Sequence, residues 1–368
     1  MSFGATLSLN IMTSQRLAPT DDQALIERAQ SGDERAYEAL IEGHRAELHA
    51  HCYRMLASVH DADDAVQEAL LRAWKGLPGF ESRSSIRTWL FRIATNSSFD
   101  VLKKRKRREL PINAGYRSNP GDTPGDAVFG ESWLEPYPDR LLEDQHSPES
   151  RFEARESLEL AFVAAIQYLP PRQRAVFILR EALSFSANEV AETLDMSVAA
   201  VNSALQRARA TIANRLPGET QQVELQRMGD KQVHKLARQY ADAIDNNDIE
   251  TLMGMLAPGA TWSMPPHPAF YEGRTAIEEF HRRDVSSVRW RHRTTSANGQ
   301  LAVGCYIYDE QRATYVASVL DVIDLHDGLI TAVTAFFTAE ASGESEQPDD
   351  YVAAVDFKRF GLPDEVTD

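Results

Sequence analysis

The spacing of hydrophobic and polar positions changes twice along this chain and divides it into three structured parts. From Asp22 to Arg108, and again from Ser157 to Leu216, apolar residues recur every three or four positions, as in amphipathic helices. Residues 109–155 between them lack this period and are rich in Pro, Gly, Asp and Ser, which is typical of a linker. Beyond residue 230, helical spacing gives way to alternating strands. The sequence therefore predicts a multidomain protein with two all-α domains followed by an α+β domain.

The first helical part is predicted to contain helices over Asp22–Ala57, from Asp61 onward, and within Gly79–Arg108. Asp61, Asp63 and Asp64 fall in the first turn of the second helix, where carboxylates complement the positive end of the helix dipole. Carboxylates in the first turn of a helix are typical of such capping, so we predict a capping and partner-docking face there and no metal site.

Basic residues gather in and around the third of these helices. Residues 72–108 hold eleven Lys or Arg against two Asp or Glu, although the whole chain has a formal net charge of -16. A positive segment in an acidic protein favours an anionic partner, with nucleic acid as the leading candidate. The alternative is that Lys103–Arg108 only complements the C-terminal end of its helix. Trp89 shares the phase of Ile86 and Leu90, so we expect it in the core.

The second helical part carries a pattern typical of a helix-turn-helix. Pro170 and Pro171 separate its first two helices. Ser186 and Glu189 have capping-box spacing, and residues 195–197 form a short turn before another helix from Val198. In such a unit the second helix enters the DNA major groove. A plain helical hairpin is the alternative.

The C-terminal part begins with helices and continues as a meander of strands. Helices are predicted over 232–244, 249–256 and 273–283, with a strand near 260–266. Three alternating runs follow Val288, and Asn298-Gly299 and Asp327-Gly328 are hairpin-turn signals between them.

These strings resemble known families. DADDAVQEALLRAWKGLPGF followed by SSIRTWLFRIATN resembles region 2 of bacterial RNA polymerase sigma factors of the extracytoplasmic-function (ECF) class in the sigma-70 family. LPPRQRAVFILRE followed by EVAETLDMSVAAVNSALQRAR resembles sigma region 4, and the elements after residue 231 resemble a SnoaL-like, NTF2-type cone. The resemblance implies these domains: a disordered leader (1–20), region 2 (21–108), an acidic linker (109–155), region 4 (156–217), a linker (218–230), a SnoaL-like domain (231–340) and an acidic tail (341–368).

The resemblance also implies partners and site residues. Such a protein binds core RNA polymerase and promoter DNA, and the β flap of the polymerase would meet residues 158–169. The polymerase β′ clamp helices would contact Asp64, Gln67 and Glu68. The promoter -10 element would be held by Arg83, Ser84, Arg87, Asn96 and Lys103. The -35 element would be read by Asn202, Ser203, Gln206 and Arg207.

Two positions depart from the family pattern in region 4. Asp195 stands where the family usually has glycine, which is tolerable because Asp adopts the left-handed conformation better than most residues. Asn202 replaces a basic residue, so we expect weak binding to an isolated -35 element.

The C-terminal domain is expected to modulate transcription in cis. Some SnoaL-like relatives use an Asp/His pair for acid-base chemistry, but the candidates here have no diagnostic spacing: His267, His292, Asp321 and Asp324. We therefore predict no enzyme, cofactor or metal. The domain is expected either to contain a pocket that binds a small molecule or to present an interaction surface that has lost its ligand. The residues proposed to line the pocket are Trp262, His267, His292 and Tyr306.

The segment WLEPYP, Trp133–Pro138, places two aromatic residues in the polar linker. We expect it to dock on another domain of this chain, and replacement of Trp133 and Tyr137 by Ala to change transcription without altering the fold. Cys52 and Cys305 match no disulfide or metal spacing, and no membrane span or signal peptide is evident. A cytoplasmic location is expected, with either Met1 or Met12 as the start.

Two other functions remain open at this point. A one-component regulator would bind operators through its helix-turn-helix and sense a ligand through its C-terminal domain, but this leaves Gly79–Arg108 unexplained. An enzyme targeted by its N-terminal domains would require turnover that depends on His267 or Asp321.

Overall fold

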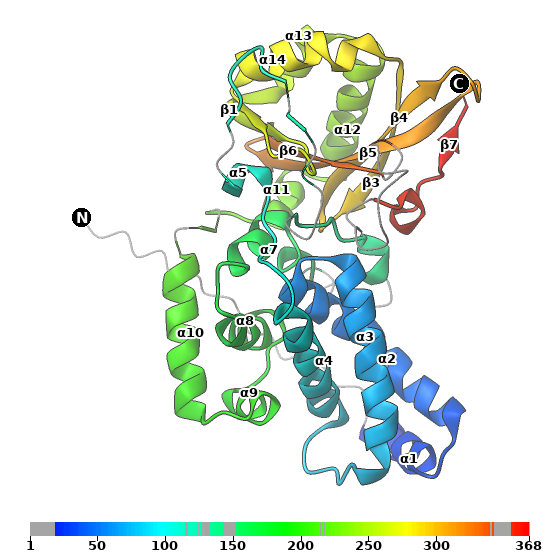
Figure 1. The fold of residues 1–368 in the computed structure, drawn as a ribbon, viewed down its shortest axis with the longest axis vertical. Helices are drawn as coiled ribbons and strands as arrows, with labels where there is room; N and C mark the ends of the chain where they lie inside the picture. Colours follow the sequence, from blue (N-terminus) through cyan, green and yellow to red (C-terminus); the bar gives the residue numbers. More distant parts are fainter. Residues whose placement is uncertain are drawn as a thin grey trace.

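A computed structural model of the chain describes residues 19–114, 117–123, 125–126, 128, 133–142, 152, 154–213, 215–216, 218–338, 341 and 355–367. The expected leader therefore falls outside the described residues, apart from its last two. Two helical modules lie side by side, and an α+β domain covers one end of both (Figure 1). None of the helices in these ranges is long and apolar enough to cross a membrane.

The first module contains α1 (Pro19–Gln30), α2 (Glu34–Leu56), α3 (Val59–Gly76), the 3-10 turn η1 (Leu77–Gly79) and α4 (Ile86–Leu102). Asp33, Ser58 and Ser85 cap α2, α3 and α4, because each side chain accepts a hydrogen bond from the backbone N–H three positions later. Trp89, which was expected in the core, is partly buried at its edge and packs against Phe80 with ring centres 5.0 Å apart.

The second module contains α7 (Leu160–Ile166), α8 (Pro171–Phe177), the π-helical turn η3 (Ile178–Ala182), α9 (Ala187–Leu194) and α10 (Val198–Ile212). The predicted break at Pro170-Pro171 and the capping box between Ser186 and Glu189 are both present. Asp195 ends α9 with φ 52°, the left-handed conformation that its position requires.

The C-terminal domain combines helices with a curved sheet. Its helices are α11 (Gln221–Met228), α12 (Asp230–Asp245), α13 (Ile249–Met255) and α14 (Arg274–Arg283), with the short turn η4 (Val285–Ser287). Its strands are β1 (Leu256–Ser263), β2 (Phe270–Glu272), β3 (Trp290–Ala297), β4 (Gln300–Asp309), β5 (Thr314–His326), β6 (Leu329–Phe337) and β7 (Glu365–Val366). The sheet order is β2-β1-β6-β5-β4-β3, and β7 pairs with β5.

Strands β3 to β6 form the predicted antiparallel meander, with turns at Asn298-Gly299 and Asp327-Gly328. Four features were not predicted. Strand β1 starts directly after α13 and runs parallel to β6, and β2 adds an edge strand. Helix α11 lies where only a linker was expected, and residues 355–367 of the expected acidic tail fold onto the sheet as η5 (Phe357–Phe360) and β7.

Two hydrophobic cores hold the molecule together. One fills the interior of the C-terminal cone between its helices and the concave face of the sheet. The other is shared by both helical modules and continues onto the opposite face of the sheet through Tyr306, Leu320 and Phe336. Because the modules share one core, the described parts of the chain pack as a single unit.

The linker contributes directly to this shared core. Trp133, Leu134 and Tyr137 are all buried, as the docking expectation for this segment required. Residues 111–114 form the one-turn helix α5 (Pro111–Ala114), and residues 139–142 form the 3-10 turn η2 (Asp139–Leu142). The segment docks on the first helical module as well as on the C-terminal domain, because Tyr53 donates a hydrogen bond to the carbonyl of Glu135.

Candidate nucleic-acid interface

The residues predicted to hold the -10 element lie on α4 and on the loop before it. Arg83 is 85% exposed and pairs with Glu81, two positions before it. Asn96 and Lys103 are exposed on α4, and Lys103 pairs with Asp100 at 2.9 Å. Ser84 is half-buried in the loop. These four side chains therefore lie at or near the surface, where a nucleic acid can reach them.

Arg87 differs from the other four because it lies between the two helical modules. Its Nε is 2.9 Å from a carboxylate oxygen of Glu47 in α2. Its guanidinium also lies over the ring of Phe185, 4.3 Å from the ring centre, and reaches the carbonyl of Leu183 at 3.4 Å. The Arg87 side chain therefore already has interaction partners, and some of them belong to the second helical module.

The basic run Lys103–Arg108 divides into an exposed part and a structural part. Arg108 is only 7% exposed and pairs with Asp61 at 2.8 Å and Glu135 at 3.4 Å. Burial raises the pKa of Glu135, and the Arg108 charge opposes that shift. Arg105 also pairs with Asp61, at 3.4 Å. Part of the run therefore fixes the linker to the start of α3 and does not face solvent.

The acidic start of α3 presents two faces. Asp64, Gln67 and Glu68, the predicted polymerase contacts, are exposed on the outer face, where Glu68 pairs with Arg72 at 2.7 Å. Asp61 points inward to the arginines above. Asp63 joins His49 at 2.9 Å and Arg359 of the C-terminal segment.

The helix-turn-helix presents its predicted reading surface to solvent. Ser197 caps α10, and the inward residues of the helix pack in the core: Val201, Ala204, Leu205, Ala208 and Ile212. The four predicted -35 residues are all exposed on the other side: Asn202, Ser203, Gln206 and Arg207. Arg209 pairs with Glu181 at 2.8 Å, so Arg207 is left as the main cation of this surface.

The four residues predicted to line a pocket in the C-terminal domain do not meet around one cavity. Trp262 and His292 point into the cone, where His292 pairs with Asp245 at 2.6 Å. His267 lies in the loop before β2, with its Nδ1 2.9 Å from the carbonyl oxygen of Gly125. Tyr306 lies on the opposite face of the sheet and donates a hydrogen bond to the carbonyl of Pro363 at 3.0 Å.

The interior of the cone is packed rather than open. Tyr271 and Phe280 stack at 4.8 Å, and Trp262 meets His281 edge-on at 4.5 Å. Tyr240 donates a hydrogen bond to Asp321 at 2.7 Å, and burial raises the pKa of the Asp321 carboxyl. Of the acid-base candidates, His292 lies near enough to Asp321 for its charge to oppose that shift, whereas His267 and Asp324 lie elsewhere, in a loop and beside Gln300 respectively.

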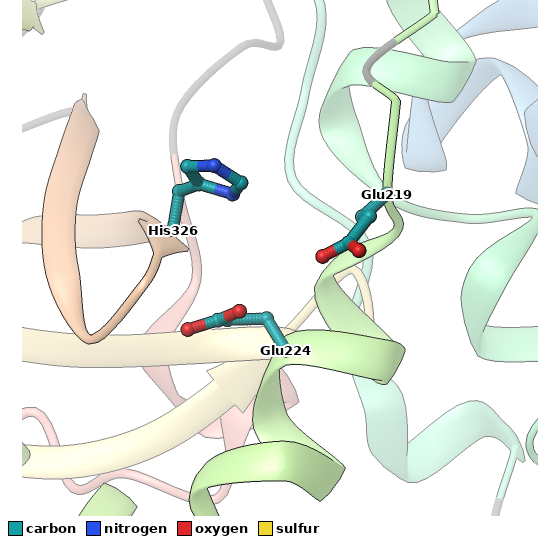
Figure 2. Close-up of side chains that lie close together, drawn as sticks. All are labelled: Glu219, Glu224 and His326. Atoms are coloured by element: carbon teal, nitrogen blue, oxygen red, sulfur yellow. The ribbon is translucent and has the colours of Figure 1, made fainter.

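One group of side chains has the composition of a metal site, but an arginine already pairs with both of its carboxylates. Glu219, Glu224 and His326 come from the start of α11 and the end of β5 and face a common space (Figure 2). Arg227 pairs with Glu219 at 2.6 Å and with Glu224 at 2.8 Å. The guanidinium supplies the positive charge that a cation would bring, so this group reads as an ion-pair cluster.

The junction between the domains was missed by sequence reasoning. Asn298 is fully buried, and its side chain accepts from the backbone N–H of Tyr137 and donates to the hydroxyl of Tyr53 and the carbonyl of Leu158. The backbone N–H of Gly299 donates to Asp139 at 2.7 Å. The sequence marked Asn298-Gly299 only as a hairpin turn, and no local signal shows that such a turn is buried.

The turn therefore links all three domains. Tyr53 belongs to the first helical module, Tyr137 to the linker and Leu158 to the start of the second module. Gln300 extends the link by accepting a hydrogen bond from the N–H of Leu160 at 2.8 Å. We call residues 298–300 the hairpin tip.

Comparison with known proteins agrees with this architecture. Family models match Sigma-70 region 2 over residues 40–108, Sigma-70 region 4 over 159–212 and a SnoaL-like domain over 237–333. The ECF RNA polymerase sigma factor SigG of Mycobacterium tuberculosis is 38% identical over 333 residues, which cover 89% of this chain and 84% of SigG. The RNA polymerase sigma-H factor of Pseudomonas aeruginosa is 33% identical over 196 residues, 53% of this chain and 94% of that protein.

A solved structure shares the fold. The ECF sigma factor SigJ of Mycobacterium tuberculosis superposes with a TM-score of 0.53 at 20% identity, covering 84% of this chain and 99% of SigJ.

Proposed function

Because this chain belongs to the ECF RNA polymerase sigma factors, we propose that it directs core polymerase to its promoters and that its SnoaL-like domain restrains this activity in cis. The outer face of α3, with Asp64, Gln67 and Glu68, would dock on the polymerase β′ clamp helices, and residues 158–169 would meet the β flap. With these contacts the protein would act in the cytoplasm, together with the polymerase. The exposure of the α3 face supports this assignment.

Promoter contacts follow from the two basic or polar surfaces. The loop before α4 and the exposed side of α4 would hold the -10 element, with Arg83, Ser84, Asn96 and Lys103 available at once. The exposed side of α10 would read the -35 element through the amides of Asn202 and Gln206, the hydroxyl of Ser203 and the guanidinium of Arg207. With a single prominent cation, α10 is expected to bind an isolated -35 element weakly.

The restraint is carried by the hairpin tip. Through Asn298 it bonds the first module, the linker and the second module at once, and every one of these bonds is buried. In the arrangement that it holds, Arg87 is engaged by Glu47 and Phe185 and is not free for DNA. We infer that separation of the two modules frees Arg87 from Phe185 and Leu183, whereas its pair with Glu47 lies within the first module and must break separately before Arg87 can hold the -10 element.

The SnoaL-like domain would act through contact rather than catalysis. Its interior is packed with aromatic side chains, and its buried Asp321 and His292 already pair with Tyr240 and Asp245, which supports a regulatory role without a small-molecule ligand. The family itself consists of transcription factors rather than enzymes.

Run-off transcription with purified core polymerase on fragments of the source genome tests the proposal. Discrete transcripts that depend on the protein are expected. Glu47→Gln removes the charge that holds Arg87 and should raise transcript yield several-fold. Glu42→Gln, on the same helix and paired with Arg45 on the surface, is the matched control and should change nothing. Absence of transcripts together with polymerase-independent DNA binding would instead favour a one-component regulator.

A further inference from the structure

Two arginines converge on one tyrosine at the border between the helical modules. The guanidinium carbon of Arg107 lies 4.3 Å from the ring centre of Tyr168, and that of Arg215 lies 4.6 Å from the same centre. The two guanidinium carbons are therefore within about 9 Å of each other. Each like-charged neighbour raises the electrostatic energy of the other, so the arrangement calls for an anion.

The three residues come from different parts of the chain. Arg107 follows α4 of the first module, whereas Tyr168 follows α7 and Arg215 follows α10 of the second module. The cluster therefore exists only while the two modules are docked. A ligand held by both arginines would bridge the modules.

Carboxylates compensate these charges only in part. Arg107 donates to Glu109 at 2.7 Å through its Nε. Arg215 is exposed and donates to the carbonyl of Thr211 at 2.8 Å, and among the described residues no carboxylate pairs with it. The local balance is thus positive.

A buried cation adds to this positive field. Arg174 is 4% exposed and is held by uncharged oxygens alone within the described part of the chain, including the carbonyls of Ile166 and Leu169. Burial, together with the charge of the nearby Arg107, lowers the pKa of Arg174 to about 9. Arg174 remains protonated at neutral pH and adds its charge to the cluster.

The chemistry of the cluster selects phosphate over a nucleobase. Guanidinium groups lie over the ring of Tyr168, so the ring is not a free platform for base stacking. Two planar guanidinium forks within about 9 Å match two adjacent phosphate groups, each of which can accept paired hydrogen bonds. The Tyr168 hydroxyl makes no hydrogen bond to another described residue and can donate to the same ligand.

We propose that Arg107, Tyr168 and Arg215 form a binding site for adjacent phosphate groups, which bridges the two helical modules and favours their docked arrangement. Adjacent phosphates occur in a free nucleoside di- or triphosphate and in the backbone of a nucleic acid. The site is separate from the proposed -10 and -35 surfaces, and it can be tested without polymerase or a promoter.

Calorimetric titration of the full-length protein with pyrophosphate tests the site directly. Binding is expected, and Arg107→Gln or Arg215→Gln should each weaken it by about tenfold, the usual effect of losing one charge-assisted pair. Arg215→Lys retains the charge without the planar fork and should be intermediate. Glu109→Gln removes the competing carboxylate and should tighten binding.

Arg289→Gln is the matched control. Arg289 also lies over a tyrosine, 3.5 Å from the ring centre of Tyr308, and pairs with Glu310, but it belongs to the C-terminal sheet. Its replacement should leave pyrophosphate binding unchanged. All of these arginines have exposed side chains, so circular dichroism should show an unchanged fold.

Two further probes identify the source of the phosphates. A nucleoside triphosphate that binds like pyrophosphate, with the same dependence on both arginines, would indicate a free nucleotide. A single-stranded oligonucleotide that alone shows this dependence would indicate a nucleic-acid backbone. If no probe binds in a manner that depends on Arg107 and Arg215, the proposal is wrong, whatever the outcome of transcription assays.

Discussion

The side-chain oxygen of Asn298 accepts a hydrogen bond of 2.7 Å from the backbone N–H of Tyr137, although 161 positions separate the two residues. The backbone N–H of Asn298 returns a bond of 2.8 Å to the carbonyl of Tyr137. This reciprocal pair joins the linker to the C-terminal sheet in the buried centre of the molecule. Because buried polar groups are costly to leave unpaired, the junction is specific as well as stable.

Replacement of Asn298 by Ala should strongly weaken the junction. The substitution removes three buried hydrogen bonds and leaves their partners unpaired, so we expect the free energy of unfolding to fall by about 3 kcal/mol. Urea unfolding of the full-length protein measures the change. Asp327→Ala is the control, since Asp327 has the same turn conformation, φ 49°, but is 77% exposed. An equal loss of unfolding free energy in both variants would show that the turn conformation, and not the buried hydrogen bonds, determines the effect.

A comparison of Gly299→Ala with Gly328→Ala should separate the energetic cost of close packing from the cost of backbone strain. A Cβ at Gly299 would lie 2.8 Å from the Cβ of Arg155 and 3.0 Å from its carbonyl oxygen. Gly328 has nearly the same φ, +74° against +70°, but nothing within 4 Å of its Cβ position. Gly328→Ala is expected to cost about 1 kcal/mol for the left-handed backbone, and Gly299→Ala about 2–4 kcal/mol.

Thermal melting of both glycine variants, followed by run-off transcription, measures the two effects. If the hairpin tip restrains the sigma domains, Gly299→Ala should also raise transcription relative to Gly328→Ala. Similar transcription from the two variants would argue against restraint through the tip.

Tyr137 corrects an expectation from the sequence. Replacement of Trp133 and Tyr137 by Ala was expected to spare the fold, but Tyr137 is fully buried, and Tyr137→Ala should cost about 3–5 kcal/mol. Tyr137→Phe is the informative variant. It removes only the hydrogen bond of 3.0 Å between the hydroxyl and His49, at a cost of about 1 kcal/mol.

A run-off assay should then show whether the Tyr137–His49 contact contributes to the restraint of transcription. We expect Tyr137→Phe to fold normally and to raise transcript yield modestly. Wild-type yield from a correctly folded Tyr137→Phe protein would place the control elsewhere in the junction.

Arg108→Gln should destabilise the protein, although it lies in a run of basic residues. The change removes the cation that faces buried Glu135 and the nearer of the two arginines that pair with Asp61, and breaking such a buried pair typically costs about 3–5 kcal/mol. Lys104→Gln, at an exposed position of the same run, should leave the urea midpoint unchanged. Equal midpoints for the two variants would contradict the structural role of Arg108.

The junction should also weaken as pH rises. Burial raises the pKa of Glu159 to about 8 and that of Asp324 to about 6. A carboxyl whose pKa is higher in the folded state binds protons more tightly there, so its contribution to stability is fully present at low pH. That contribution is lost as pH rises from about 4 to about 8.

Urea unfolding of wild type and Glu159→Gln between pH 5.5 and 8.5 isolates this effect. Stability of the wild type should fall relative to Glu159→Gln by a few kcal/mol over this range, because the glutamine cannot ionise. Parallel pH profiles for the two proteins would show that Glu159 does not titrate in this window.

The elements of both helical modules could be predicted from the sequence because their signals are local. The capping box at Ser186 and Glu189, the break at Pro170-Pro171 and the turn at Asp195 each depend on residues within a few positions. Apolar spacing also placed Asn202 and Gln206 on the exposed side of α10. Helical periodicity and turn chemistry are properties of short segments, so they need no knowledge of the fold.

Only the tertiary structure decided which of these surfaces are free. Arg83 and Arg87 look equivalent in the sequence, yet Arg83 is exposed while Arg87 is held by Glu47, forty positions away. Likewise, Asn298-Gly299 and Asp327-Gly328 carry the same turn signal, but one turn is buried at the centre of the molecule and the other faces solvent. Burial and pairing depend on contacts between distant segments, and those contacts are set by packing of the whole chain rather than by local spacing.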